Sequence, residues 1–241
     1  MGSIELFPRT QPRRAAITAW RAQPLASGVI RVREARLADY TAVRGLQIRA
    51  GGAACAMRQF ESRLHGFPAG QMVAVCDGHV VGYAAALVVD WDMHGAALTW
   101  SGLTADGFFT THDAEGSTLF GADMVVDASP HAVGAGRALL QARRKLCRRL
   151  NLRRAVAAPP LAGYSKIADR LTPEQYATRI VWGDVLEPTW RFLATQGFQF
   201  CGVLRGFTPP GDTSCGHAGL LAWLNPLHAP PGPQANERRC A

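Results

Sequence analysis

The chain has 241 residues, 48% of them hydrophobic, and a formal net charge of +8 at pH 7. This length suits one domain of ordinary size with a substantial core and short flanking segments. No apolar run approaches the roughly 20 residues that a membrane-spanning helix requires, so we expect no membrane partner. The six cysteines lack the paired spacing of a zinc site or a disulfide framework, so we expect neither a metal nor a disulfide network.

The basic charge comes almost entirely from arginine, because only two of the 26 basic residues are lysine. A basic chain favours nucleic acid, a membrane surface or an anionic ligand as its partner. No basic stripe alternates with aromatic residues and no nucleic-acid module is recognisable, so we expect no nucleic-acid partner. Residues 1–27 contain arginines but no apolar core segment, and they are therefore predicted to form a flexible N-terminal extension rather than a secretory signal.

The first half of the domain, which begins at Gly28, is predicted from hydrophobic periodicity and turn signals. A helix with Asp39 as its N-cap is expected to run toward Ala50. Asp77-Gly78 separates two apolar runs and predicts a hairpin. The pattern predicts strands over residues 29–33, 71–76 and 79–89, and a second helix over residues 57–66.

The second half contains a long insertion over residues 95–112, which is predicted to be irregular. Thr172-Pro173-Glu174 predicts the start of a helix that runs toward Trp182, because threonine caps a helix and proline suits its first turn. A Pro-Gly-Asp loop is expected to join the last two strands. The pattern predicts strands over residues 154–158, 198–204 and 219–224, and a helix over residues 188–196. Strands, helices and strands again predict a mixed α/β sandwich.

Residues 122–140 are the most informative segment, because a strand, a glycine loop and a basic amphipathic helix follow one another. Met124–Val126 predicts a short buried strand, and Gly134 and Gly136 precede a helix that begins at Arg137. A helix N-terminus presents unpaired N–H groups and a partial positive charge, so the segment predicts a phosphate-binding loop. An ordinary strand-to-helix turn with a solvated basic face is the alternative.

The helix after this loop is predicted to be amphipathic. Apolar residues recur at helical spacing at Leu139, Ala142, Leu146 and Leu150. The arginines fall largely on the other side, at Arg143, Arg144, Arg148 and Arg149. The loop has no Gly-Lys-Ser/Thr of a nucleotide P-loop, and no Gly-x-Gly-x-x-Gly followed by an acidic residue as in a dinucleotide fold.

The sequence His131-Ala132-Val133-Gly134-Ala135-Gly136 resembles the pyrophosphate loop of the GNAT superfamily of acyl-CoA N-acyltransferases, whose motif is Arg/Gln-x-x-Gly-x-Gly/Ala. His131 replaces the usual first residue, and Ala132 stands where the superfamily often has glycine. The resemblance extends from about Ile30 to Pro226 and is closest to GNAT domains fused ahead of nitrilase-like amidohydrolases in bacteria. The matching segments include residues 67–71, 77–83, 89–92, 111–116, 142–154 and 171–176.

The resemblance implies an α/β GNAT fold, in which helices flank a mixed central sheet with a splayed strand pair at the acyl-CoA site. It places the domain at 28–227, before a disordered tail over 228–241, so we expect the acyltransferase-like domain to stand alone. It also implies a cytoplasmic bacterial protein that uses acetyl-CoA or another short acyl-CoA as cosubstrate. The strand would hold the pantetheine arm, splay beyond Val126 and lead to a loop that holds the pyrophosphate. The cofactor-binding residues implied are Met124, Val125, Val126, His131, Ala132, Val133, Gly134, Ala135, Gly136 and Arg137.

Acyl transfer to an amine needs a proton acceptor for the amine and a proton donor for the departing thiolate. The superfamily often places a tyrosine four residues before the last Gly-Phe, where this chain has Leu193. Tyr164, the nearest tyrosine in a matching segment, is the candidate donor, and a tyrosine that packs a loop is the alternative. In the nitrilase-linked relatives a histidine follows this tyrosine, whereas this chain has Ser165.

Two carboxylates flank the predicted strand, Asp123 and Asp127, and period-two alternation places both on one side. Either could accept the amine proton directly or through water, and Asp127 could instead cap the turn. His112 lies in a matching loop and is a candidate for a role beside the substrate, with structural hydrogen bonding as the alternative.

The implied function is an N-acetyltransferase that moves an acetyl or short acyl group to a small-molecule or protein amine within a ternary complex. One alternative is an acyl-thioester decarboxylase or S-acyltransferase that acts with an acyl carrier protein, because a basic helix suits an acidic partner. The other alternative is a non-catalytic acyl-CoA-binding interaction module. No metal is required for any of these activities.

Overall fold

The structure is a computed structural model that describes residues 28–91, 98–209 and 213–230. The predicted N-terminal extension, most of the predicted C-terminal tail and the Pro-Gly-Asp loop at 210–212 lie outside the described residues. Within the predicted tail, His228 Nδ1 lies 2.9 Å from the carbonyl oxygen of Asn151, and the Ala229 amide donates to Asn151 Oδ1 over 2.9 Å. The described chain therefore stays attached to the domain as far as Ala229.

A seven-stranded mixed sheet forms the centre of the molecule, in the order β1-β2-β3-β4-β5-β7-β6. All neighbouring strands are antiparallel except β4 and β5, which are parallel. The strands are β1 (Arg31–Glu34), β2 (Gln71–Cys76), β3 (His79–Val89), β4 (Thr118–Val126), β5 (Arg154–Ala157), β6 (Gln199–Leu204) and β7 (Ala218–Leu224).

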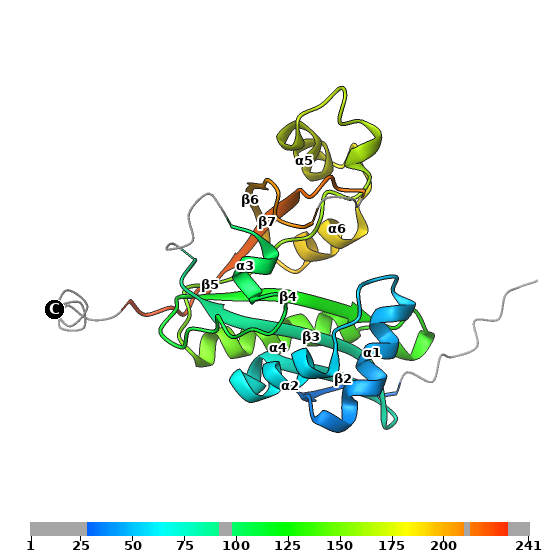
Figure 1. Cartoon of the computed structure of the whole chain (residues 1–241), viewed down its shortest axis with the longest axis vertical. Helices are drawn as coiled ribbons and strands as arrows, with labels where there is room; N and C mark the ends of the chain where they lie inside the picture. Colours follow the sequence, from blue (N-terminus) through cyan, green and yellow to red (C-terminus); the bar gives the residue numbers. More distant parts are fainter. Residues whose placement is uncertain (1–27, 92–97, 210–212, 231–241) are drawn as a thin grey trace, which may run out of the picture.

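Six α-helices cover the sheet in the described part of the chain. They are α1 (Tyr40–Arg49), α2 (Met57–Gly66), α3 (Trp100–Thr104), α4 (Ala135–Arg149), α5 (Pro173–Trp182) and α6 (Pro188–Thr195). Figure 1 shows α5 and α6 beside β6 and β7 at the upper end of the molecule, while α1, α2 and α4 surround β2, β3 and β4 below. The described helices include none that is both long and apolar enough to cross a bilayer.

The strand alternation divides the core into two layers. On one face, Ala84 and Leu119 pack with Leu139 of α4 and with buried residues of α5 and α6. On the other face, Tyr83 and Phe120 pack with buried residues of α1, α2 and α3. Consecutive residues of β3 and β4 therefore reach different layers, which fixes the face that each β4 side chain presents.

Most of the predicted elements are confirmed, and Asp77-Gly78 makes the hairpin turn with φ of 48° and 82°. Four predictions about individual helices and strands were wrong. The insertion contains the short helix α3, whose N-cap Thr99 accepts a hydrogen bond from the Gly102 amide. Strand β4 begins six residues earlier than predicted, at Thr118. Helix α4 begins at Ala135, because its N-terminal turn includes the glycine loop.

The fourth correction concerns Asp39, which occupies the N-cap position of α1 but whose side chain makes no capping hydrogen bond to that helix. Its carboxylate accepts hydrogen bonds from Arg33 at 2.6 and 2.8 Å and from the Arg36 amide at 2.8 Å. The Arg33 guanidinium lowers the pKa of this carboxyl. Asp39 therefore fixes β1 to the turn before α1.

Strand β4 leaves β5 halfway along its length. The register pairs Thr118 with Arg154 and ends where Gly121 faces Ala157, although β4 continues to Val126 beside β3. A β-bulge follows at once, because Ala85 faces Asp123 whereas Ala86 faces Gly121. Ala122 is the extra residue, and such a bulge bends the strand and increases its twist. The splay thus begins five residues earlier than the sequence predicted.

Candidate functional site

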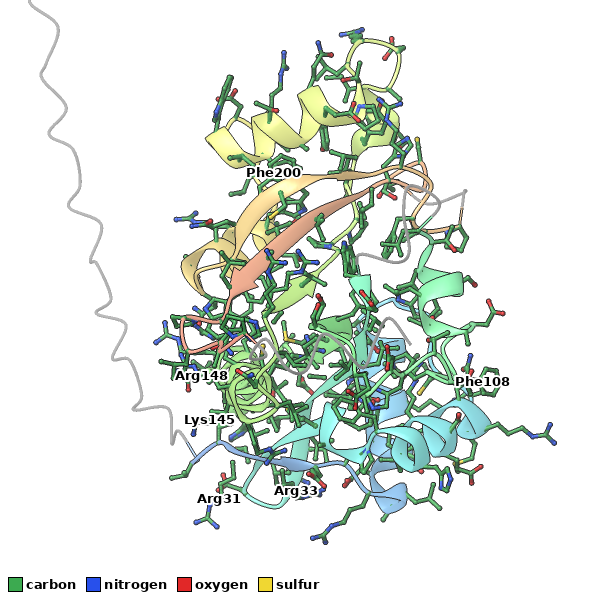
Figure 2. All side chains as sticks on the ribbon, turned by 90° about the vertical axis from the view of Figure 1, so that its left-hand side faces the viewer. Arg31, Arg33, Phe108, Lys145, Arg148 and Phe200 are labelled. Atoms are coloured by element: carbon green, nitrogen blue, oxygen red, sulfur yellow. The ribbon has the colours of Figure 1, made fainter. Side chains whose placement is uncertain are left out.

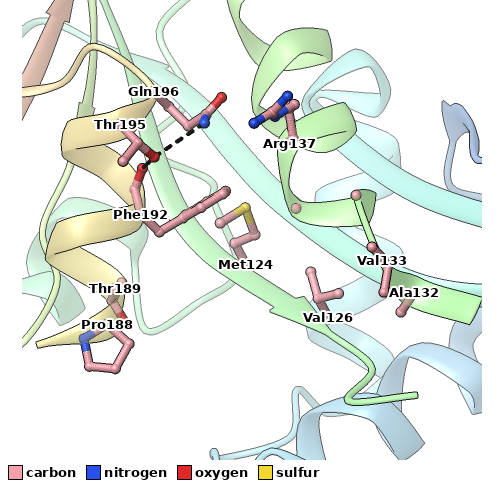
Figure 3. A pocket seen from close by; sticks show the side chains of 12 residues that line it. Met124, Val126, Ala132, Val133, Arg137, Pro188, Thr189, Phe192, Thr195 and Gln196 are labelled. Atoms are coloured by element: carbon pink, nitrogen blue, oxygen red, sulfur yellow. Dashed lines mark hydrogen bonds between the residues drawn. The ribbon is translucent and has the colours of Figure 1, made fainter. Parts of the chain in front are cut away.

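A cavity of about 780 Å³ lies where β4 has left β5, between the N-terminus of α4 and helix α6. Figure 3 shows Met124 and Val126 of β4 at its floor, Arg137 of α4 on one side and Phe192 of α6 on the other. Its lining residues are Met124, Val126, Ala132, Val133, Gly134, Gly136, Arg137, Pro188, Thr189, Phe192, Thr195 and Gln196. Cavities of this size and mostly apolar lining are typical of small-molecule sites.

The glycine loop forms the polar end of this cavity. Gly134 has a φ of 88°, the left-handed conformation that side chains disfavour, and it is the N-cap of α4. The first helical hydrogen bond runs from the Ala138 amide to the Gly134 carbonyl over 2.9 Å. The amides at positions 135–137 therefore have no acceptor within the helix. They point out of its N-terminal end, the end at which helices commonly bind anions.

Ten cofactor-binding residues were expected, and seven of them line the cavity. Val125 packs into the opposite core layer, as the strand alternation requires. Ala135, the first residue of α4, is buried in the core, and His131 is exposed and does not line the cavity. The Ala132 and Val133 amides donate to Ser129 and Pro130 carbonyls within their own turn.

The backbone of β4 is also directed into the splay. The Asp127 amide donates to Val81 of β3 over 2.9 Å, and Asp123 faces Ala85 in the same register. In an antiparallel ladder alternate residues direct both backbone groups toward one neighbour. Met124 and Val126 consequently direct their N–H and C=O groups away from β3, to the side where β5 no longer pairs.

One face of helix α6 forms the opposite wall of the cavity. Phe192 lies against the glycine loop, since a Cβ on Gly136 would stand 3.2 Å from its ring. Gln196, just after the helix, accepts a 3.3 Å hydrogen bond from Arg144 of α4. Leu193, which stands where the superfamily often has tyrosine, is 3% exposed and packs into the core.

Two carboxylates lie on the other face of β4 and both contact α1. Asp123 Oδ2 accepts a 2.6 Å hydrogen bond from Gln47 Nε2, and Gln47 is itself fixed by accepting from the Cys55 amide. Asp127 pairs with Arg49 at 2.9 Å and also accepts from the Ser129 amide at 2.9 Å. The Ser129 amide and Arg49 lower the pKa of Asp127. Asp123 is thus the carboxylate beside the bulge. Asp127 lies at the end of β4 and caps the turn at Ser129, in addition to its ion pair with Arg49.

The structure does not bring the three predicted catalytic residues together. The Tyr164 hydroxyl donates to the Leu171 carbonyl over 2.8 Å, and burial raises its pKa. His112 stacks on Phe67 at 4.2 Å between ring centroids, and its Nδ1 accepts from the Val88 amide. Val88 faces the start of β4, so His112 lies at the opposite end of β4 from Asp127.

No group of three His, Cys, Asp or Glu side chains is placed to hold a metal ion among the residues that the structure describes. The exposed face of α4 is basic. Figure 2 shows Lys145 and Arg148 of α4 on the same side of the molecule as Arg31 of β1, and α4 packs against β1. Lys145 and Arg148 lie toward the C-terminal end of α4, whereas Arg137 in its first turn is the basic side chain that lines the cavity.

The parallel β4–β5 pair that separates beside a glycine loop and a helix N-terminus defines a GNAT fold. Solved structures support this assignment. The GphF GNAT-like decarboxylase in complex with isobutyryl-CoA superimposes with a TM-score of 0.65 at 21% identity, over 81% of this chain and 99% of that chain. The loading GNATL domain of CurA from Lyngbya majuscula gives a TM-score of 0.69 at 15% identity, over 82% of this chain and 98% of that one. The acetyltransferase-like yncA from Salmonella typhimurium, with acetyl-CoA, gives 0.52 at 17% identity, over 85% and 98%.

Two proteins of Bacillus subtilis are similar in sequence. The probable hydrolase YhcX is 28% identical over 169 residues, which cover 70% of this chain and 33% of YhcX. The uncharacterized N-acetyltransferase YkwB is 25% identical over 167 residues, which cover 69% of this chain and 74% of YkwB. This chain therefore spans only about a third of the length of YhcX. No family model matches the sequence.

Proposed function

We propose that this protein transfers an acetyl or other short acyl group from acyl-CoA to an amine, by direct attack within a ternary complex. The observation that carries the proposal is the continuous path from the α4 N-terminus, through the 780 Å³ cavity, to the open side of β4. A pyrophosphate fits the helix end, and an extended pantetheine arm fits the unpaired strand edge.

The thioester would lie next to Met124, whose N–H is directed into the splay. A donor at this place stabilises the negative charge that develops on the carbonyl oxygen. The acceptor amine would come from the α1 side, where Asp123 is held by Gln47. We propose Asp123 as the proton acceptor in preference to Asp127, because the Asp127 carboxylate is engaged by Arg49 and by the Ser129 amide.

A Gly136→Glu variant is expected to weaken acetyl-CoA binding about 30-fold, or by about 2 kcal/mol. The new side chain would begin between Phe192 and Val126 and carry a negative charge into the phosphate end of the cavity. Calorimetric titration of both proteins measures the dissociation constants.

The matched control for this variant is Gln141→Glu, which places the same charge on the exposed side of α4. The control should bind acetyl-CoA within about twofold of the wild type. Equal affinities of the Gly136→Glu and control variants would refute the assigned cavity.

A second candidate is decarboxylation or S-acyl transfer of a thioester on a carrier protein. The GNAT-like decarboxylase and the CurA loading domain superimpose with TM-scores of 0.65 and 0.69, against 0.52 for yncA. Leu193 also leaves the usual tyrosine position without a hydroxyl. These observations favour chemistry that does not require that proton donor.

Incubation with malonyl-CoA, with and without an amine mixture, separates the two candidates. N-acyl transfer predicts free CoA that appears only when an amine is present. Decarboxylation predicts acetyl-CoA and carbon dioxide without an amine. Mass spectrometry of the CoA products distinguishes these outcomes, and acetyl-CoA formation without amine would replace the first candidate by the second.

A further inference from the structure

Arg143 is a buried arginine on the face of α4 that packs against the sheet. The sequence predicted it for the exposed side of the helix, but it is 6% exposed and shares the buried stripe with Leu139 and Leu146. Burial lowers its pKa to about 10, so it remains a cation at neutral pH. Its Nε atom has no hydrogen-bond partner, and among the described residues it forms no ion pair with a carboxylate.

This position is costly, because a buried guanidinium loses its hydration, and the nearby Asp123 carboxylate, which raises the pKa of Arg143, does not pair with it directly. A leucine would pack there with no such cost. The guanidinium group of Arg143 instead makes hydrogen bonds to two backbone carbonyls. Arg143 Nη2 donates to Ala85 over 2.6 Å and also to Asp123.

Those two carbonyls belong to the facing residues next to the bulge in β4. The fit is close, since a Cβ on Gly121 would stand 2.8 Å from Arg143 Nη1. Arg143 is therefore built into the point where β4 separates from β5. Any residue larger than glycine at position 121 would force the guanidinium away.

The Asp123 carbonyl and the Met124 N–H belong to the same peptide group. A trans peptide directs these two groups to opposite sides, so Arg143 holds the oxygen while the N–H is directed into the splay. A cationic donor on the carbonyl withdraws electron density from the peptide and strengthens the N–H as a donor, because hydrogen bonds in series polarise one another.

We infer that Arg143 is a positioning residue that fixes and polarises the Asp123–Met124 peptide, so that the Met124 N–H binds the thioester carbonyl of an acyl-CoA. The inference rests on the proposed acyl-CoA function. Arg143 touches no reacting atom and acts through the peptide. No covalent step involves it.

The test compares Arg143→Met with Arg149→Met, an exposed arginine in the last turn of the same helix. Isotope-edited infrared spectroscopy of bound acetyl-CoA labelled with ¹³C at the thioester carbonyl measures the hydrogen bond without requiring turnover. We expect a lowered carbonyl frequency in the wild type and in Arg149→Met, and a frequency near that of free acetyl-CoA in Arg143→Met. Where turnover is measurable, kcat should fall about tenfold with KM for acetyl-CoA within about threefold, since the loss is indirect.

Arg143→Lys provides the second variant if Arg143→Met does not fold. A lysine in this buried site has a lowered pKa and loses its charge as the pH rises, whereas the pKa of Arg143 stays at about 10. The carbonyl band of Arg143→Lys should therefore move toward the free frequency between pH 7 and 9, while the wild-type band stays constant.

The outcomes separate the two proposals. A band that is shifted in the wild type but not in Arg143→Met, without acyl transfer to any amine, contradicts the proposed transfer and supports the role of Arg143. An equal band in Arg143→Met and the wild type, or a pH-independent band in Arg143→Lys, overturns the role of Arg143. A wild-type protein that binds no acyl-CoA overturns both.

Discussion

An Asp123→Asn variant is expected to lower kcat for acyl transfer by about 10²–10³-fold, within the range that a general base contributes. Asparagine keeps the size of the side chain and can still accept the 2.6 Å hydrogen bond from Gln47, but it cannot take a proton from an amine. Because Asp123 lies on the face of β4 opposite the cavity that we propose for acyl-CoA, the affinity for acetyl-CoA should stay within about twofold. Steady-state kinetics and calorimetry measure the two quantities separately.

Asp127→Asn tests the other carboxylate in the same assay. Its carboxylate is engaged by Arg49 and by the Ser129 amide, so kcat should change only a few-fold. A large loss of rate in Asp127→Asn together with a normal rate in Asp123→Asn would assign the proton transfer to Asp127. Normal rates in both variants would leave neither carboxylate as the base.

Replacing Trp190 by alanine is expected to lower the free energy of unfolding by about 3–5 kcal/mol, the cost of removing a buried tryptophan. Trp190 is 3% exposed. Its ring packs on Gly219 of β7, where a Cβ would stand 2.1 Å away, and on Phe200 at 5.5 Å. These contacts join α6 to the end of the sheet, so the variant should also loosen the α6 wall of the cavity.

Urea denaturation followed by circular dichroism measures this change from the midpoint and the slope. Trp182→Ala is the matched control, because Trp182 lies at the end of the neighbouring helix and is 75% exposed. It should cost less than about 0.5 kcal/mol. A loss below about 1 kcal/mol for Trp190→Ala would show that α6 does not depend on this contact.

Local signals predicted much of this fold. The hairpin of β2 and β3 was predicted from two apolar runs with Asp77-Gly78 between them. The start of α5 was predicted from Thr172-Pro173. Each of these signals lies within a few residues of sequence. Strand β4 was only partly predicted, since Gly121 interrupts its apolar pattern. That glycine is required by a neighbour on α4, and no short window of sequence contains both residues.

The parts of the candidate site that the backbone forms were predicted from the sequence. The contacts between side chains from different layers were not. The glycine loop and the strand before it are contiguous, so their contribution to the cavity could be predicted. The contact between Gln47 and Asp123 joins residues 76 positions apart, and no local signal announces it. The hydrophobic periodicity of α4 predicted that Arg143 faces solvent. This prediction was wrong, because it assumes that charged residues lie on the exposed face of a helix.

The sheet order also has a consequence for synthesis. Strand β5 pairs on one side with β4 and on the other with β7, the last strand of the described chain. The Asn225 amide donates to the Arg153 carbonyl at the end of this pairing. A nascent chain that has not yet released residues 218–224 from the ribosome therefore carries β5 with an open edge, which invites pairing with other chains. Folding of the half that bears α6 has to wait until β7 has been synthesised and has left the ribosome, and a truncation before Ala218 should yield aggregates rather than a smaller folded domain.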